Sequence, residues 1–156
     1  MSVLRFFNRQ KTRPIDLQLL KQIALATLTE FLDRDHYELG VHLVNAKEMS
    51  AVNEKYLHHE GSTDVITFDY NENDQSLRGE IFICIDDALI QAKQFAVSWQ
   101  SEVARYFVHG LLHLEGFDDT EPALRKAMKR RENNLVKELS QRFDFRKLSR
   151  RKRAAR

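Results

Sequence analysis

Two histidines and an aspartate have the types and spacing of metal ligands. His109 and His113 are four residues apart, so on a helix their imidazoles lie on one face and can reach one point. Gly116 follows three residues later, where a left-handed glycine can end the helix and turn the chain back. Asp119 would then return toward the histidines as a third ligand. Three protein ligands with an open fourth position are typical of a catalytic zinc ion.

The alternative is that the two histidines only pack in a hydrophobic core. A single histidine often does so. A pair at this spacing that is followed by a glycine and a carboxylate seldom does, and we therefore favour the metal site.

The residue after the first histidine bears on the reaction. In the HExxH pattern of zinc peptidases it is a glutamate that acts as general base, but here it is Gly110. No serine or cysteine nucleophile is indicated by its spacing, so a metal-bound water would have to attack. We expect hydrolysis. A phosphodiester suits such a site because the metal can also neutralise charge on a phosphoryl oxygen.

Composition predicts one compact intracellular domain. The chain has 156 residues, of which 42% are hydrophobic, enough to bury a core. The single Cys84 excludes an internal disulfide and a cysteine-rich metal site and fits a reducing compartment. No apolar run approaches the length of a membrane span. These features predict a cytoplasmic protein with no membrane partner.

Positive charge is concentrated at the C-terminus. Residues 146–156 read RKLSRRKRAAR, with seven basic and no acidic side chains, although the net charge of the whole chain is only +2. We expect residues 1–141 to form the single domain and 142–156 to form a basic, disordered tail. Such a tail would attract the phosphates of nucleic acid, or it would serve only for solubility.

Hydropathy patterns predict an α+β fold in which a small four-stranded mixed sheet packs with about five helices. We expect strands at residues 3–8, 39–43, 63–70 and 80–85. We expect helices after an Asp16 cap, after an Asn45–Glu48 capping box, after a cap at Asp86 or Asp87, at about 100–115, and from Pro122. The helix at 100–115 carries the histidines and is apolar almost all round, which indicates a central, buried position.

The histidine segment is part of a longer pattern. Residues 109–119 read HGLLHLEGFDD and resemble the HGxLHLxGxDH signature of the YbeY family, bacterial metal-dependent endoribonucleases implicated in ribosomal RNA maturation and ribosome quality control. Three further blocks resemble the family: Asn53 and Tyr56 with the Thr63–Phe68 run, the strand Gly79–Cys84, and Glu102 ahead of the histidine helix. The similarity extends over roughly residues 39 to 140.

The resemblance implies a metzincin-like fold around the central histidine helix, one Zn2+ per chain and an RNA substrate. It implies an endoribonuclease that acts in maturation of the 16S ribosomal RNA 3' end, with ribosomal RNA and the small ribosomal subunit as partners. The main alternative is a ribosome-associated RNA-binding factor with a structural metal and little or no nuclease activity. A peptidase is the third possibility, and it is disfavoured because Gly110 stands where zinc peptidases have their catalytic glutamate. An enzyme needs an open metal position that faces a cleft, whereas a binding factor tolerates a closed site.

Asp119 departs from the family pattern, which has a third histidine at this position. The implied ligands are therefore His109, His113 and a carboxylate, which zinc accepts. The added negative charge should make the bound water less acidic and shift preference toward Mn2+ or Fe2+. The neighbouring Asp118 matches a family aspartate and is our candidate for a residue that supports the ligands, although the two carboxylates could exchange roles.

Leu57 is the second departure, because the family usually has an arginine there. A phosphate contact would then be missing, and nearby His58, His59 or Arg78 could replace it, although an ordinary polar loop explains the two histidines equally well. The substrate-binding candidates are His59, Arg78, Thr63 and Asp64. For Thr63 and Asp64, the alternative is that they hydrogen-bond the backbone where the strand begins.

Overall fold

A computed structural model describes residues 2–73 and 75–149. Within these residues, four strands form one mixed sheet in the order β1-β2-β4-β3. β1 (Val3–Asn8), β2 (Tyr37–Val44) and β4 (Leu77–Cys84) run parallel, and β3 (Val65–Asp69) pairs with β4 in the antiparallel direction. The predicted α+β fold with a four-stranded mixed sheet is confirmed.

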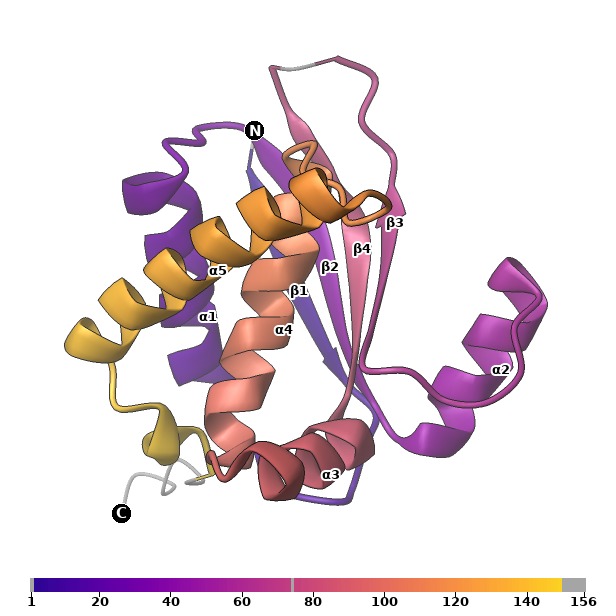
Figure 1. The fold of residues 1–156 in the computed structure, drawn as a ribbon. Coiled ribbons are helices and arrows are strands. Elements are labelled where there is room, and N and C mark those ends of the chain that lie inside the picture. The colour runs from indigo at the N-terminus through magenta and orange to yellow at the C-terminus, as the bar shows by residue number, and fades with distance from the viewer. Residues whose placement is uncertain (1, 74, 150–156) are drawn as a thin grey trace.

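Helices cover both faces of this sheet unequally (Figure 1). One face carries α1 (Leu17–Ala26), which continues as a π-helical segment to Phe31, together with α4 (Trp99–Leu114), and α5 (Pro122–Arg142) crosses over α4. α3 (Ile85–Phe95) packs beside α4, and α2 (Ala46–Leu57) lies toward the other face. No helix in the described part of the chain is both long and apolar enough to cross a membrane.

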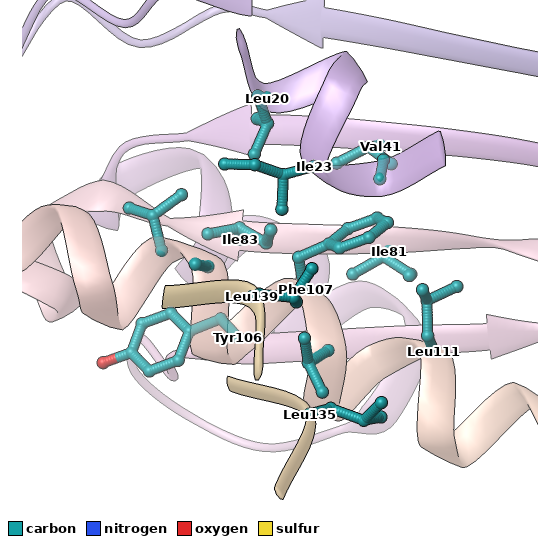
Figure 2. Packing of buried hydrophobic residues seen from close by; sticks show 14 of the residues in the cluster. Leu20, Ile23, Val41, Ile81, Ile83, Tyr106, Phe107, Leu111, Leu135 and Leu139 are labelled. Atoms are coloured by element: carbon teal, nitrogen blue, oxygen red, sulfur yellow. The ribbon is translucent and has the colours of Figure 1, made fainter. Parts of the chain in front are cut away.

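α4 is the central helix of the domain. It lies between the sheet and α5, and ten of its sixteen residues are buried. Phe107 and Leu111 from α4 pack against Ile81 of β4 and Ile23 of α1, with Leu135 and Leu139 of α5 on their other side (Figure 2). Full burial of each such side chain contributes roughly 1.5–3 kcal/mol. This packing confirms that the histidine-bearing helix is central and fixes its position.

Gly110 allows α4 to approach the sheet closely. A Cβ atom at this position would lie 2.8 Å from Cγ2 of Ile81, nearer than nonbonded carbon atoms pack. A glycine inside a helix lowers helix stability by about 1 kcal/mol relative to alanine. At this position the glycine makes the close contact between α4 and β4 possible. The consequence is a fixed height of the neighbouring His109 above the sheet.

Local capping follows the sequence in two of three predicted places. Asp16 accepts hydrogen bonds from the backbone amides of Gln18 and Leu19 at 3.0 and 3.1 Å. Asn45 accepts one from the amide of Glu48 at 2.9 Å. The Glu48 carboxylate does not complete the predicted box in this structure but accepts a hydrogen bond from Arg9.

The predicted cap at Asp86 or Asp87 is wrong. α3 begins earlier, at Ile85, directly after the last residue of β4, and has no side-chain cap. Asp86 instead accepts hydrogen bonds from the amide of Ala46 at 2.6 Å and from the hydroxyl of Thr12 at 2.8 Å. The carboxylate therefore joins two distant connections, which short-range patterns do not reveal.

The predicted boundary of the domain at residue 141 is also wrong. Residues Phe145–Ser149 form a 3-10 turn, in which Phe145 and Leu148 are buried. The carbonyl of Leu148 accepts a hydrogen bond from the amide of Asp16 at 2.7 Å. The basic residues between them obscured these two apolar anchors in the sequence. The rest of the predicted tail, residues 150–156, lies outside the described residues.

Candidate metal centre

His109, His113 and Asp119 come together at the C-terminal end of α4. Asp119 Oδ2 lies 3.8 Å from His109 Nε2 and 3.7 Å from His113 Nε2. Two atoms that each lie about 2.0–2.2 Å from one zinc ion are at most about 4.4 Å apart, so both distances fit a shared ion. All three ligand atoms lie within 4.8 Å of one another, and no other such group occurs in the chain from 2 to 73 and 75 to 149.

Gly116 turns the chain back toward the histidines. Its φ is +103°, in the left-handed region that favours glycine. Its amide donates to the carbonyl of His113 at 3.0 Å, and the next amide, of Phe117, donates to Leu112 at 2.9 Å. This pair of bonds is a Schellman motif. The helix end has the form that the sequence predicted, and it directs residues 117–119 over the last turn of α4.

Asp118 holds the ligand-bearing loop in shape. Its Oδ1 accepts from the amides of Asp119 and Thr120 at 2.7 and 3.2 Å, and its Oδ2 accepts from the Thr120 hydroxyl at 3.2 Å. The hydrogen bond from the Asp119 amide is the main reason that the pKa of Asp118 lies below its ordinary value. In this arrangement Asp119 faces the histidines while Asp118 organises its backbone.

The far ring nitrogen of each histidine has a protein partner. His109 Nδ1 lies 2.7 Å from Glu132 Oε1, and His113 Nδ1 lies 3.2 Å from the carbonyl oxygen of Phe117. Both partners are acceptors, which favours a hydrogen on each Nδ1, and Nε2 is then the ring atom that would bind a metal beside Asp119. Metal-binding histidines are commonly oriented in this way.

Glu132 is a functional residue that sequence reasoning missed. It lies on α5, is only 2% exposed, and also accepts hydrogen bonds from Arg105 at 2.6 Å and Lys129 at 3.0 Å. Burial alone would raise the pKa of Glu132, but the hydrogen bonds from His109, Arg105 and Lys129 outweigh burial and lower it to about 2. The signal was available, because a glutamate stands on the apolar face of a helix where charged residues are rare.

Two clefts meet at the ligand group. The larger, of about 600 Å³, lies among α3, α4 and α5, and the smaller, of about 500 Å³, lies beside β3 and the end of α2. Both are lined by His109 and Asp119, together with Asp64 and Val65. The side chains of His109, His113 and Asp119 are 30%, 28% and 44% exposed. The ligand group therefore faces open space on the side away from α4.

Thr63, Asp64 and Leu57 lie beside this group. All three line the smaller cleft. Asp64 also supports the start of β3, because its Oδ1 accepts a hydrogen bond from the amide of Val65 at 2.8 Å. This contact is the one expected from the alternative that Asp64 hydrogen-bonds the backbone where the strand begins. His59 is exposed in the loop after α2 and lines neither cleft.

Arg78 lies on the opposite face of the sheet. Side chains alternate along a strand, and the neighbouring Gly79 and Ile81 face α4, so Arg78 points away from the histidines. It forms ion pairs with Glu38 at 3.2 Å and Glu72 at 3.5 Å. This arrangement contradicts the prediction that Arg78 binds substrate at the metal group.

The nearby positive charges come instead from α4 and α5. Arg125 donates from Nε to the carbonyl of Asp119 at 3.3 Å and lines the larger cleft with Arg105 and Lys129.

The structure also disfavours the peptidase alternative, which already lacks the glutamate general base at position 110. The residue after His109 faces Ile81, and a glutamate there would have to enter space that β4 occupies.

The family model described as "Endoribonuclease YbeY" matches residues 5–140. An "Endoribonuclease YbeY" from Chlorobaculum parvum is 36% identical over 130 residues, 83% of this chain and 90% of the relative. One from Finegoldia magna is 31% identical over 144 residues, 88% of this chain and 94% of the relative.

The fold is also found in a protein of known structure. The solution structure of a Thermotoga maritima protein superposes with a TM-score of 0.68 at 24% identity, and the match covers 99% of this chain and 100% of that one. At this identity the likeness concerns the fold alone.

Proposed function

Because the chain belongs to the YbeY family of endoribonucleases, we propose that it cleaves RNA by metal-dependent hydrolysis during maturation of ribosomal RNA. The family makes the chain a hydrolase whose substrate is RNA. The finer parts of the proposal are the 16S 3' end as substrate, the small ribosomal subunit as partner, a role in ribosome quality control and a cytoplasmic location.

One observation carries the metal-dependent part of the proposal. Three ligand atoms converge at the junction of two clefts and leave one side of the group open. A structural metal site is normally closed by a fourth protein ligand, whereas a catalytic site keeps a position for water or substrate. This geometry favours an enzyme over the alternative, a ribosome-associated RNA-binding factor with a structural metal.

His109, His113 and Asp119 would hold the ion, Zn2+ in the first instance, with Mn2+ or Fe2+ as alternatives because of the carboxylate. When bound, such an ion acidifies a water molecule and neutralises charge on a phosphoryl oxygen. The protein contributes the orientation of the ligands. Glu132 and the carbonyl of Phe117 hold the two imidazoles by Nδ1, and fixed ligands lose less freedom on binding.

Arg125 and Lys129 are the proposed contacts for the RNA backbone. The side chain of Lys129 is 61% exposed, Arg125 is also exposed, and both line the larger cleft next to Asp119. Lysine and arginine side chains position nucleic acids through their phosphates. These residues would supply the positive charge that the family arginine, here Leu57, does not.

The experiment that tests the proposal combines metal analysis with RNA cleavage. The purified chain, loaded separately with Zn2+, Mn2+ or Fe2+, is incubated with single-stranded RNA and with a precursor of the 16S 3' end. We expect cleavage that depends on the ion and is lost in His109→Ala. Glu54→Gln, which changes an exposed side chain of α2 outside both clefts, is the control and should cleave normally. Stoichiometric metal without cleavage of any RNA would support the RNA-binding factor instead.

A further inference from the structure

The larger cleft extends well beyond the metal ligands. Glu102, Tyr106 and His109 line it from successive turns of one face of α4. Glu102 and His109 are seven positions apart, which corresponds to roughly 10 Å along the helix axis. The cleft therefore has a second polar end, formed by Glu102 and Tyr106 and set apart from the ligand group. Nothing in the proposed reaction uses this end.

The hydroxyl group of Tyr106 is buried without a partner. The residue is 4% exposed, and its Oη has no hydrogen bond within the described residues. Figure 2 shows the ring beside the core, with the oxygen directed away from the other labelled side chains. Burial is the main cause that raises the pKa of Tyr106, and the charges of Asp64 and Glu102 act in the same direction. The Glu102 carboxylate is also close enough to the hydroxyl to raise this pKa, although it makes no hydrogen bond of normal geometry with it, so the hydroxyl keeps its hydrogen. A ligand with an acceptor atom would give this buried hydroxyl the hydrogen bond that it lacks.

Glu102 places a buried carboxyl group at the same end. It is 7% exposed, and burial raises its pKa although the charges of Arg105 and Lys129 act in the opposite direction. A first-turn glutamate is favourable to a helix simply because of the helix dipole. An exposed glutamate would serve that purpose at less cost, so the burial of Glu102 in the wall of a cleft calls for another reason.

The mouth of the cleft carries an exposed aromatic ring. Phe95 is 66% exposed and Val97 is 44% exposed, and both line the cleft. Unstacked RNA bases are commonly held on aromatic side chains while polar groups read their Watson–Crick edges. A planar ligand with a polar edge fits this combination.

We propose that this cleft binds a guanine base of the RNA, with Glu102 and Tyr106 reading its Watson–Crick edge. The inference rests on the proposed function and names a subsite of it. The N1–H and the N2 amino group of guanine are adjacent donors that would both bind the Glu102 carboxylate, and O6 would accept from the Tyr106 hydroxyl. No other standard base offers two adjacent donors on this edge. Phe95 would stack on the ring, and Arg125 would hold a flanking phosphate.

Nucleotide binding to the zinc-loaded full chain tests the proposal. Titration with GMP, AMP, CMP and UMP, followed by calorimetry, should give the lowest dissociation constant for GMP. Glu102→Gln replaces one acceptor oxygen by a donor, and it should weaken GMP binding about 10-fold, since a bidentate base contact is worth that order of discrimination. AMP binding should change little. Glu54→Gln, on the exposed side of α2, is the matched control and should bind as the unaltered chain does.

Tyr106→Phe provides a second, independent variant. The ring stays in place, so we expect weaker GMP binding but a higher melting temperature, because an unpartnered hydroxyl is removed. Zinc content and thermal unfolding are measured for each variant to show that it is folded. The proposal is overturned if GMP binds no more tightly than AMP, or if Glu102→Gln keeps the preference for GMP.

Cleavage of RNAs that carry a single guanine separates this inference from the proposed function. Cleavage beside that guanine supports both. Cleavage without any base preference leaves the proposed function in place and overturns the guanine subsite. Preferential GMP binding without cleavage of any RNA supports the subsite and counts against the nuclease.

Discussion

The buried carboxylate of Glu132 and the partly exposed imidazole of His109 form a pair, in which Glu132 Oε1 lies 2.7 Å from His109 Nδ1. The pair joins α5 to α4 across the core side of the ligand group. It orients His109 without touching the position that a metal would occupy. Arg105 and Lys129 both form ion pairs with Glu132, so its carboxylate is not an isolated buried charge.

Glu132→Gln should weaken metal binding while the fold is retained. The amide can still accept a hydrogen bond, but it carries no charge to make His109 a better ligand. Loss of such a supporting group typically costs 10–100-fold in metal affinity, and we expect about that loss in a competition titration with a chelator. Glu138→Gln, exposed on the same helix, is the control. Equal affinities in the two variants would remove Glu132 from the site.

The same carboxylate should make the stability of the metal-free protein depend on pH. Its pKa is lowered from the ordinary 4.5 to about 2 on folding. A carboxyl group whose pKa is lowered by folding stabilises the folded state at pH values above its pKa in the unfolded chain. This stabilisation disappears as the pH falls from about 5 toward 2. The shift corresponds to roughly 3 kcal/mol. Urea unfolding between pH 7 and pH 2.5 should show a steeper loss for the unaltered chain than for Glu132→Gln, and parallel curves would contradict this assignment.

Exchange of the carboxylate ligand should move the pH profile of RNA cleavage. Asp119→His would replace a negative ligand by a neutral one, so a bound water would become more acidic and the profile should shift to lower pH. Asp119→Ala should lose most of the metal affinity. Asp118→Ala should lose less, because Asp118 touches only the backbone of Asp119 and Thr120 and the Thr120 hydroxyl. Full metal affinity in Asp119→Ala would exclude it as a ligand.

Gly110→Ala should destabilise the protein by overpacking. The added methyl group would lie 2.8 Å from Ile81, and such insertions typically cost about 1–3 kcal/mol, partly offset by the better helix propensity of alanine. Ile81→Ala in the same chain should recover part of the loss, since it removes the atoms that clash. Chemical denaturation of the two single variants and the double variant measures the coupling. Additive effects would show that the two residues do not compete for space.

The C-terminal segment should divide into two parts with different roles. Leu148→Ala should lower the free energy of unfolding by about 2–5 kcal/mol, because a fully buried leucine is lost. Deletion of 150–156 should flatten the salt dependence of RNA binding, where each neutralised phosphate contributes about −0.7 to the log–log slope. An unchanged slope would make these residues irrelevant to RNA.

Short-range sequence patterns correctly predicted the features that depend on residues close together in the chain. The spacing of His109 and His113 and the glycine at 116 determine the end of α4, because helix periodicity and left-handed backbone act within a few residues. The central position of α4 followed from its apolar surface. The placement of Asp119 beside the two histidines was also accessible, since only five residues separate it from the second histidine.

Residues that act across the fold could not be placed in the same way. Glu132 reaches His109 only because α5 crosses α4, and Asp86 in the first turn of α3 reaches Thr12 in the connection between β1 and α1. Arg78 was assigned by its proximity in sequence, but a one-residue step along β4 moves a side chain to the other face of the sheet. Tertiary arrangement, and not residue type, decides these cases.

The bond between Asp16 and Leu148 bears on the order in which the protein can fold during translation. α1 emerges early from the ribosome, whereas the residues that cover its first turn are among the last described ones to be made. Because chains are synthesised from the N-terminus, this part of the core stays uncovered until Phe145 and Leu148 have been synthesised. A chain that stalls shortly before residue 145 would lack both apolar anchors and would expose that surface to chaperones or proteases.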